Sequence, residues 1–338
     1  MTRKPRSKRT PAVAQGESPF GGQRSWTWTG AWPVSLIVGA ALLGGLLPVS
    51  TSLELEYAIS LSVFAVATNL LIGFSGLISF GQGVFYGLGA YIVALGWLHH
   101  GLSFWPAMVL APLAGAAMAV VIGLIALRTR MAYFALLTLA FSQLTYVIFQ
   151  AQYGFTSGDN GIFGQFVPRW LNNPRYSFFF VLGISVVSLL VMWKITASPF
   201  GLTLKAIRDN RNRAEALGIN IFRTQLLAMA ISGFFSAVAG TLFAVYSQSA
   251  TPDLFLWTSS AIPVFMVVLG GMYRYLGPIL GALVYQFAHY FLVQYTKDWQ
   301  VVLGIVLLVI VLFRPEGLAG IFSDLKRLRR SRTDRSSL

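Results

Sequence analysis

The chain of 338 residues offers few side chains that could do acid–base or nucleophilic chemistry. It contains 11 Asp and Glu, three His and no Cys, which excludes a disulfide and a thiolate metal site. No His, Asp and Glu cluster at metal-ligand spacing, and no nucleophile is spaced to meet a base. The sequence therefore shows no set of residues that would support a hydrolytic or metal-dependent enzyme.

The acidic residues also bear on ion coupling, because carriers driven by protons or sodium commonly keep carboxylates inside the helix bundle. We expect every Asp and Glu here, including Glu54 and Glu56, to lie in tails, loops or span edges. This weighs against ion coupling, although backbone carbonyls can also hold sodium. One ionisable residue, His289, lies within an apolar block, as either a relay group or a neutral imidazole hydrogen-bonded between helices.

The elements that must position these side chains are membrane helices. Hydrophobic residues make up 56% of the chain and charged residues 11%, against about a quarter charged in soluble domains. The apolar blocks have bilayer-spanning length. We predict an all-α polytopic membrane bundle of eight to ten spans, with 84–98 and 254–269 either complete or re-entrant. The ten candidates are 31–49, 56–75, 84–98, 104–127, 132–151, 176–193, 224–247, 254–269, 276–295 and 299–313.

The net charge of +14 reflects Lys and Arg in tails and loops, so it does not indicate nucleic-acid binding. If all ten spans cross, 22 of the 25 basic residues fall on one side, which the positive-inside rule assigns to the cytoplasm. Both termini are then cytoplasmic. We expect a disordered basic tail (1–30), a transmembrane domain (31–314) with a cytoplasmic loop (198–223), and a basic C-terminal tail (315–338).

Small residues follow the predicted spans at four-residue spacing, as in Gly83/Gly87, Gly277/Gly281 and the row Ala228, Ser232, Ser236 and Gly240. Such rows let helix backbones approach closely in lipid. Two glycine-interrupted stretches, 73–89 and 270–281, stand apart, because paired broken segments commonly flank a transporter's binding site. They are either pathway or a tightly packed hairpin. The candidate pathway residues are Gly81, Gln82, Gly83, Tyr86, Gly270 and Gly271.

The loop 198–223 is too long for a simple connector and has helical spacing of apolar residues. Asp209/Arg213 and Arg211/Glu215 are opposite charges four residues apart, and Gly218 is placed to end the helix. A short amphipathic helix here would lie on anionic lipid or dock into a groove of another protein.

A family resemblance favours docking on a protein. Residues 198–220 (SPFGLTLKAIRDNRNRAEALGIN) closely resemble the cytoplasmic loop of permease subunits of branched-chain amino acid ABC importers. The resemblance extends to 69–81 (NLLIGFSGLISFG), 87–91 (GLGAY), 266–271 (MVVLGG) and 314–318 (RPEGL).

The resemblance implies a multi-pass subunit of the bacterial inner membrane that works with a second permease, two cytoplasmic ATPases and a periplasmic binding protein. This chain lacks a phosphate-binding loop, so it would be no enzyme and would hold no cofactor; ATP and magnesium would sit in the ATPases. By carry-over, 206–218 is the coupling helix that enters an ATPase groove. Its candidate residues are Ala206, Ile207, Arg208, Asp209, Arg213, Glu215, Ala216, Leu217 and Gly218.

On the other side, the loop 154–161 resembles a polar Gly-rich loop of the family. Thr156, Asp159, Asn160 and Gly161 would contact the binding protein or gate the pathway, unless the loop is an ordinary turn. Gln82 stands where the family usually has a histidine, and Ile262 and Pro263 stand where many members have a glutamate. Both departures leave the substrate open among branched-chain or other amino acids, urea and short amides.

Two rival functions remain at this stage. An ion-coupled secondary carrier predicts uptake by this polypeptide alone, driven by an ion gradient. A membrane anchor or assembly scaffold predicts that the basic tails are the working parts.

Overall fold

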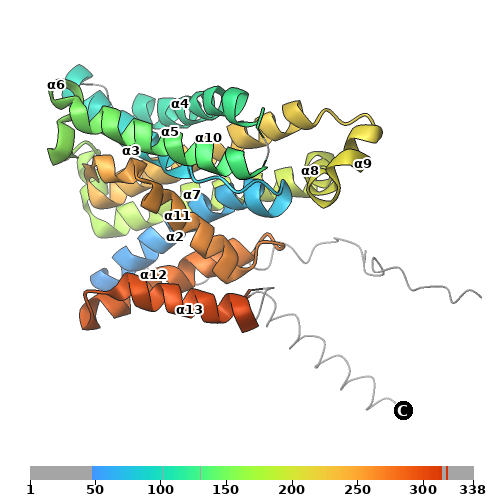
Figure 1. The fold of residues 1–338 in the computed structure, drawn as a ribbon. Helices are drawn as coiled ribbons and strands as arrows, with labels where there is room; N and C mark the ends of the chain where they lie inside the picture. The colour runs from blue at the N-terminus through green and yellow to red at the C-terminus, as the bar shows by residue number, and fades with distance from the viewer. Residues whose placement is uncertain (1–47, 102, 130, 314–316, 319–338) are drawn as a thin grey trace, which may run out of the picture.

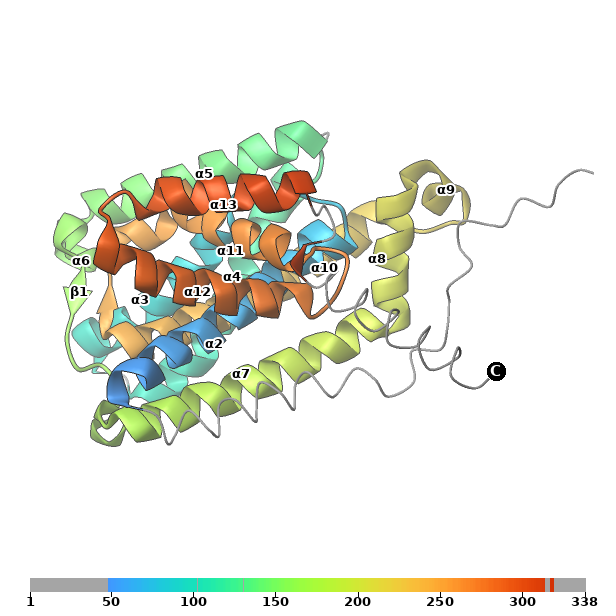
Figure 2. The ribbon, with the colours of Figure 1, turned by 90° about the horizontal axis from the view of Figure 1, so that it is seen from below.

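The computed structural model describes residues 48–101, 103–129, 131–313 and 317–318. Its long helices lie side by side and form one bundle (Figures 1 and 2). Two short strands, β1 (Ile162–Phe163) and β2 (Ser249–Ala250), pair antiparallel. The long helices are α2 (Val49–Asn69), α3 (Gln82–His100), α4 (Phe104–Ala126), α5 (Met131–Ala151), α7 (Pro174–Ala197), α10 (Ile221–Ser247), α11 (Trp257–Gly270), α12 (Gly277–Tyr295) and α13 (Trp299–Phe313).

The predicted spans agree with these helices. Nine of the ten coincide with a described helix, and nearly all of the remaining one, 31–49, lies outside the described residues. Five helical stretches among the described residues are long and apolar enough to cross a membrane: Val49–Phe74, Phe104–Ala126, Ala132–Ala151, Pro174–Ala197 and Ile221–Ser247. The eighth predicted span is short, since α11 has 14 residues, whereas α3 has 19. The chain is a polytopic helical membrane protein.

The second predicted span, 56–75, starts earlier in the structure than expected. Helix α2 begins at Val49, so Glu54 and Glu56 lie inside it, and Glu56 is only 1% exposed. Neighbouring helices stabilise both groups: Ser177 Oγ of α7 donates to Glu56 Oε1 (2.6 Å), and Gln286 Nε2 of α12 donates to Glu54 Oε2 (2.7 Å). Hydropathy along one segment cannot register partners on other helices.

Helix α10 is the centre of the packing, and its small residues explain why. The row of small residues on α10 (Ala228, Ser232, Ser236 and Gly240) is buried. Neighbouring helices pack so closely against this helix that larger side chains would clash. A Cβ at Gly240 would lie 1.9 Å from the Tyr86 carbonyl oxygen of α3, and one at Gly233 would lie 2.4 Å from Ala119 Cβ of α4. The prediction that small residues bring backbones together is confirmed, also for Gly281, where a Cβ would lie 1.9 Å from the Met266 carbonyl oxygen.

The two polar segments that the sequence singles out lie at opposite ends of the bundle. Helices α8 (Pro199–Asp209) and α9 (Arg211–Ala216) project from one end, beyond α7 and α10 (Figures 1 and 2). The other end carries the short elements α6 (Tyr153–Thr156), η2 (Gly158–Asn160), β1 and β2, with η3 (Arg169–Asn172) and η4 (Pro252–Phe255) in the same connections. A membrane around the bundle would therefore place these two segments on different sides.

Candidate functional site

The first glycine-interrupted stretch does break a helix. After Asn69 the chain of α2 widens into one π-helical turn, η1 (Leu70–Phe74), and then runs without helix until Gln82 begins α3. Gly76 has φ +74°, a conformation that favours glycine. π-Helical turns are uncommon and often mark functional positions. Gly83, Gly87 and Gly89, by contrast, lie within α3.

Gln82 is fully buried at the start of α3. Its side-chain Oε1 accepts hydrogen bonds from Ser236 Oγ (2.9 Å) and Ser232 Oγ (3.2 Å), both on α10. Ser232 Oγ also donates to the Ala67 carbonyl of α2 (2.7 Å). Gln82 therefore joins the three helices that surround the break, and one turn later Tyr86 stacks on Phe64 of α2 with ring centroids 4.4 Å apart.

The other candidates in this stretch are closed in by α5 and α11. A Cβ at Gly81 would lie 3.1 Å from the Thr138 carbonyl oxygen, and one at Gly83 would lie 2.8 Å from Ser260 Oγ. The backbone N–H of Gly83 donates to that same Ser260 Oγ (2.8 Å). Gly81, Gln82, Gly83 and Tyr86 are all buried, so a passage at this point requires helices to separate.

The second stretch is a compact turn between α11 and α12. Gly270 ends α11, and Gly271 has φ +109°. A Cβ at Gly270 would lie 1.8 Å from the Gly277 carbonyl oxygen, and one at Gly317 would lie 2.5 Å from the Gly271 nitrogen. The 314–318 motif thus brings its glycine against this turn.

The two stretches meet at a point that the candidate residues did not include. A Cβ at Gly73 would lie 2.1 Å from the Met272 carbonyl oxygen, so the π-turn of α2 touches the α11–α12 turn there. Glycines at both places are visible in the sequence, but their proximity depends on how the helices pack. The six candidate pathway residues themselves divide between the start of α3 and this turn.

The polar loop forms two helices rather than the single predicted one. The chain breaks at Asn210 (φ −158°, ψ 101°), whose side-chain Oδ1 accepts from the Arg213 N–H (2.9 Å) as the N-cap of α9. Asn is a favoured cap, so it competes with helix continuation at this position. Gly218 does end α9: it has φ +82°, its N–H donates to the Glu215 carbonyl, and the Ile219 N–H donates to the Ala214 carbonyl, as in a Schellman motif.

The break also changes the ion pairs. Asp209 does not pair with Arg213 as predicted, but with Arg208, whose Nε and Nη2 donate to Asp209 Oδ1 at 2.9 and 2.8 Å. The structure likewise shows no ion pair between the described residues Arg211 and Glu215. The break at Asn210 separates Asp209 from Arg213, so the spacing argument fails for that pair, whereas Arg211 and Glu215 both lie within α9 and still form no ion pair.

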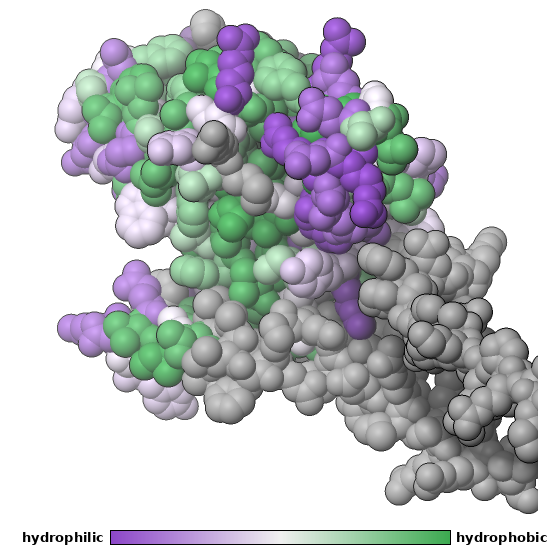
Figure 3. Space-filling model, turned by 45° about the vertical axis from the view of Figure 1, so that its right-hand side comes forward, coloured by the Kyte–Doolittle hydropathy of each residue, from purple (hydrophilic) through white to green (hydrophobic). Residues whose placement is uncertain are grey.

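The predicted coupling residues fall into an outer and an inner set. Ala206, Asp209, Arg213, Glu215, Ala216, Leu217 and Gly218 are exposed. Ile207 is 3% exposed and packs with Ala214 and Ile221, while Arg208 turns toward the bundle. Leu217 and the unpredicted Leu202 are 74% and 62% exposed, so apolar side chains stand among the charges. Figure 3, turned toward this end, shows hydrophilic side chains gathered there beside an apolar surface.

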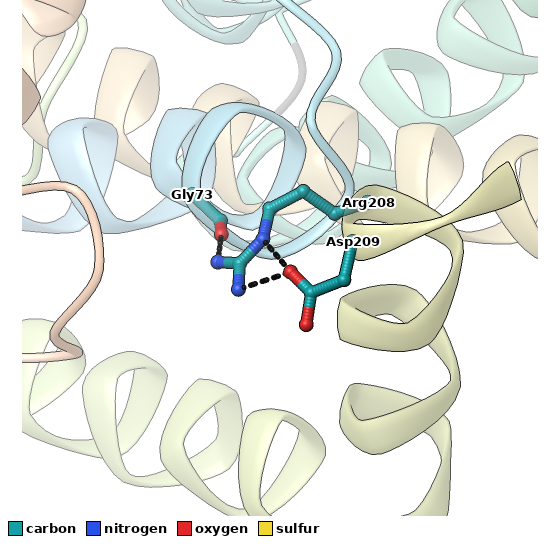
Figure 4. A network of polar contacts seen from close by, with 3 residues as sticks. All are labelled: Gly73, Arg208 and Asp209. Carbon is teal, nitrogen blue, oxygen red and sulfur yellow. Dashed lines mark hydrogen bonds and ion pairs between the residues drawn. The ribbon is translucent and has the colours of Figure 1, made fainter. Parts of the chain in front are cut away.

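The inner set touches the π-turn of α2. One guanidinium nitrogen of Arg208, Nη1, donates to the Gly73 carbonyl oxygen (Figure 4). Lys205 Nζ lies over the Phe74 ring, 5.1 Å from its centroid, and burial together with the Arg208 charge lowers the pKa of Lys205, against the opposing effect of Asp209. Helix α8 is therefore fastened to the break in α2 by two cationic side chains.

A family model described as the branched-chain amino acid transport system permease component matches residues 50–312. The chain belongs to this permease family. The high-affinity branched-chain amino acid transport system permease protein LivM of Salmonella typhimurium is 29% identical over 283 residues, which cover 76% of this chain and 67% of that protein. No solved structure matches the chain.

Two archaeal relatives come from Methanocaldococcus jannaschii. Its probable branched-chain amino acid transport permease protein LivM is 26% identical over 305 residues, 84% of this chain and 83% of that protein. Its probable LivH protein is 26% identical over 193 residues, 54% of this chain and 56% of that protein. The residues matched by the family model include both glycine-interrupted stretches and α8–α9.

At the opposite end of this permease lie the four residues predicted to contact the binding protein or gate the pathway. They also fall into a buried and an exposed pair. Thr156 is buried, and its Oγ1 donates to the Phe149 (2.6 Å) and Gln152 (2.8 Å) carbonyls. Gly161 is buried with φ +69°, just before β1. Asp159 and Asn160 are exposed, and Asp159 accepts from Gln150 Nε2 (2.9 Å). Two of the four residues thus shape the loop, and two are presented on its surface.

Among the described residues, no group of three or more His, Asp and Glu could hold a metal ion. His289 lies part-buried in α12 with its ring parallel to that of Tyr285, at a centroid distance of 6.4 Å. Both alternatives for His289, a relay group or a neutral imidazole hydrogen-bonded between helices, stay predictions.

Proposed function

We propose that this chain is a membrane-spanning subunit of an ATP-driven importer, and that it forms part of the pathway for branched-chain amino acids. The family match over residues 50–312 carries this proposal. The relative named LivM in Salmonella typhimurium is a permease of a branched-chain amino acid transport system, which supports the substrate class. The chain would sit in the inner membrane, with both termini, α8 and α9 in the cytoplasm.

The energy source would be two separate ATPase subunits, because the chain has no phosphate-binding loop of its own. The exposed face of α8–α9 would enter a groove of one ATPase subunit, with Leu217 and Leu202 as apolar anchors among charged residues. ATP and magnesium would be bound by those subunits. Closure of the ATPases would move α8–α9, and the motion would open and close the bundle.

A second permease would complete the pathway. The chain resembles both a LivM and a LivH relative in one archaeon, which supports a pair of related but different permeases. On the outer side, exposed Asp159 and Asn160 would meet a substrate-binding protein or gate the entrance. The buried start of α3 is the expected closed point of the pathway, because helices α2, α5, α10 and α11 converge on it.

The proposal is tested by reconstitution. Genes beside this one should encode the second permease, two proteins with phosphate-binding loops and one secreted binding protein. The complete assembly in proteoliposomes should accumulate radiolabelled leucine only with ATP inside and loaded binding protein outside. Accumulation without the ATPases would contradict the proposal, and a binding protein specific for urea or a short amide would change the substrate.

A further inference from the structure

Arg208 differs from the rest of the predicted coupling residues because its guanidinium meets three separate parts of the chain. It donates to the Gly73 carbonyl in the π-turn of α2, pairs with Asp209 at 2.8 Å, and lies over the Tyr273 ring, 5.3 Å from its centroid (Figure 4). The Arg208 side chain is 22% exposed, whereas that of Asp209 is 61% exposed. The cation is therefore directed into the bundle and its counter-ion toward the surface.

The Gly73 carbonyl is an acceptor that the helix itself leaves open. The last carbonyls of a helix have no backbone donor within it, and here the chain leaves helical geometry directly after Phe74. Nearby carbonyls find backbone donors, since the Gly76 N–H donates to Ile72 and the Leu77 N–H to Leu71. Gly73 instead receives a charged donor from α8, and charge-assisted hydrogen bonds are the stronger kind.

Close packing of the Arg208 side chain against Gly76 supplements this hydrogen bond. A Cβ at Gly76 would lie 2.9 Å from Arg208 Cγ, so the Arg208 stem rests against the backbone that follows the π-turn. The neighbouring Leu204 and Ile207 are buried at 0% and 3% exposure. Helix α8 cannot shift by more than a small distance without carrying the end of α2 or breaking these contacts.

The ring contact reaches the second stretch. Tyr273 follows Gly271 in the turn between α11 and α12, and its side chain is 62% exposed, so its position depends little on burial in the core. A cation over an aromatic face is attracted by the negative charge of the ring face. Both broken segments that the sequence singles out are thus attached to one guanidinium.

We infer that Arg208 is the positioning residue that carries motion of α8 to both broken segments, and that it is not part of the surface that binds the ATPase. This inference rests on the proposed function and assigns a separate role within it. The exposed residues of α8–α9 would hold the ATPase, and Arg208 would convert their displacement into movement at Gly73 and Tyr273. Binding of the ATPase and use of its energy would then depend on different residues.

The test uses the complete importer in proteoliposomes with the variants Arg208→Met, Arg208→Lys and Tyr273→Leu. The matched control is Arg128→Met, an exposed arginine in the turn after α4 and outside α8–α9. Three quantities are measured for each: co-purification of the ATPases, ATP hydrolysis stimulated by loaded binding protein, and leucine imported per ATP. For Arg208→Met we expect unchanged co-purification and about tenfold less leucine per ATP, within the usual range of coupling between sites.

Arg208→Lys keeps the charge but loses the forked donors, so we expect a smaller loss, and Tyr273→Leu should lower leucine per ATP without removing the Gly73 bond. Arg128→Met should match the wild type. Wild-type leucine per ATP in Arg208→Met would overturn the inference, as would loss of ATPase co-purification, which would place Arg208 in the docking surface.

If Arg208→Met fails to assemble, Arg208→Lys and Tyr273→Leu still test the inference, and wild-type leucine per ATP in both variants would overturn it. Failure of the proposed function would differ, since the wild type itself would then show no ATP-driven uptake.

Discussion

The side-chain oxygen of Gln82 accepts a hydrogen bond from Ser236 Oγ at 2.9 Å, inside a bundle where neither group reaches water. The bond joins the first turn of α3 to the small-residue face of α10. It lies at the point where the permease chain breaks between α2 and α3. A satisfied hydrogen bond in this buried, low-dielectric position fixes the start of α3 against α10, and the proposed pathway would require it to break when the helices separate.

Replacing Gln82 by Leu should destabilise the closed bundle. The variant leaves Ser236 without its acceptor, while Ser232 keeps the Ala67 carbonyl, and an unsatisfied buried polar group costs about 1–3 kcal/mol. We expect a lower melting temperature in detergent and reduced leucine uptake. Gln300→Leu, at an exposed position of α13, is the control and should melt as the wild type does. An unchanged melting temperature for Gln82→Leu would show that the amide is not holding these helices.

Replacing Gly240 by Ala should disrupt the crossing of α3 and α10. The new Cβ would lie 1.9 Å from the Tyr86 carbonyl oxygen, which is backbone and cannot rotate away. Overpacking of this kind costs about 1–3 kcal/mol or more. Gly183→Ala on α7 is the matched control, because nothing lies within 4 Å of its Cβ. We expect the first variant to lose monodisperse elution on size-exclusion chromatography, and an intact profile would contradict the close approach.

Replacing Leu217 by Ser should weaken ATPase binding without changing the stability of the permease. Leu217 is 74% exposed at the end of α9, so its removal opens no cavity. An apolar anchor in a docking groove commonly contributes more than about 1 kcal/mol to binding. We expect roughly tenfold less ATPase captured at equal permease concentration. Leu98→Ser, at the end of α3 away from α8–α9, should capture normally, and equal capture by both variants would place the docking surface elsewhere.

Replacing Glu56 by Gln distinguishes ATP-driven import from an ion-coupled carrier. Glu56 is buried in α2 beside Ser177, and it reopens the question that the sequence had weighed against ion coupling. An uncharged amide can accept the Ser177 hydroxyl and has no charge to desolvate, so we expect a folded protein with ATP-driven uptake preserved. Asp298→Asn, an exposed carboxylate, is the control. Loss of uptake in Glu56→Gln, together with collapse of wild-type uptake by a protonophore, would favour the carrier.

The sequence predicted the helices well because long apolar blocks separated by glycine, proline and charge are local signals. It also located both broken stretches and the end of α9 at Gly218, since glycine at positive φ has a local cause. These features need no knowledge of distant partners.

The predictions that were wrong depended on partners or on competition within a segment. Asn210 capped a new helix and separated Asp209 from its expected partner Arg213, because capping competes with helix continuation at that position. Helix α2 starts at Val49 rather than at Glu56, and the burial of Glu56 against Ser177, 121 residues away, has no local signal. The contact of Gly73 with Met272, and the position of Arg208 between two stretches, arise from packing of α2, α8 and the α11–α12 turn.

The most direct measurement is leucine accumulation in proteoliposomes that contain this chain with and without its ATPases, second permease and binding protein. The account predicts uphill uptake only for the complete set, dependent on internal ATP and insensitive to protonophores and sodium ionophores. Uphill uptake by this chain alone, abolished when an ion gradient is collapsed, would contradict it.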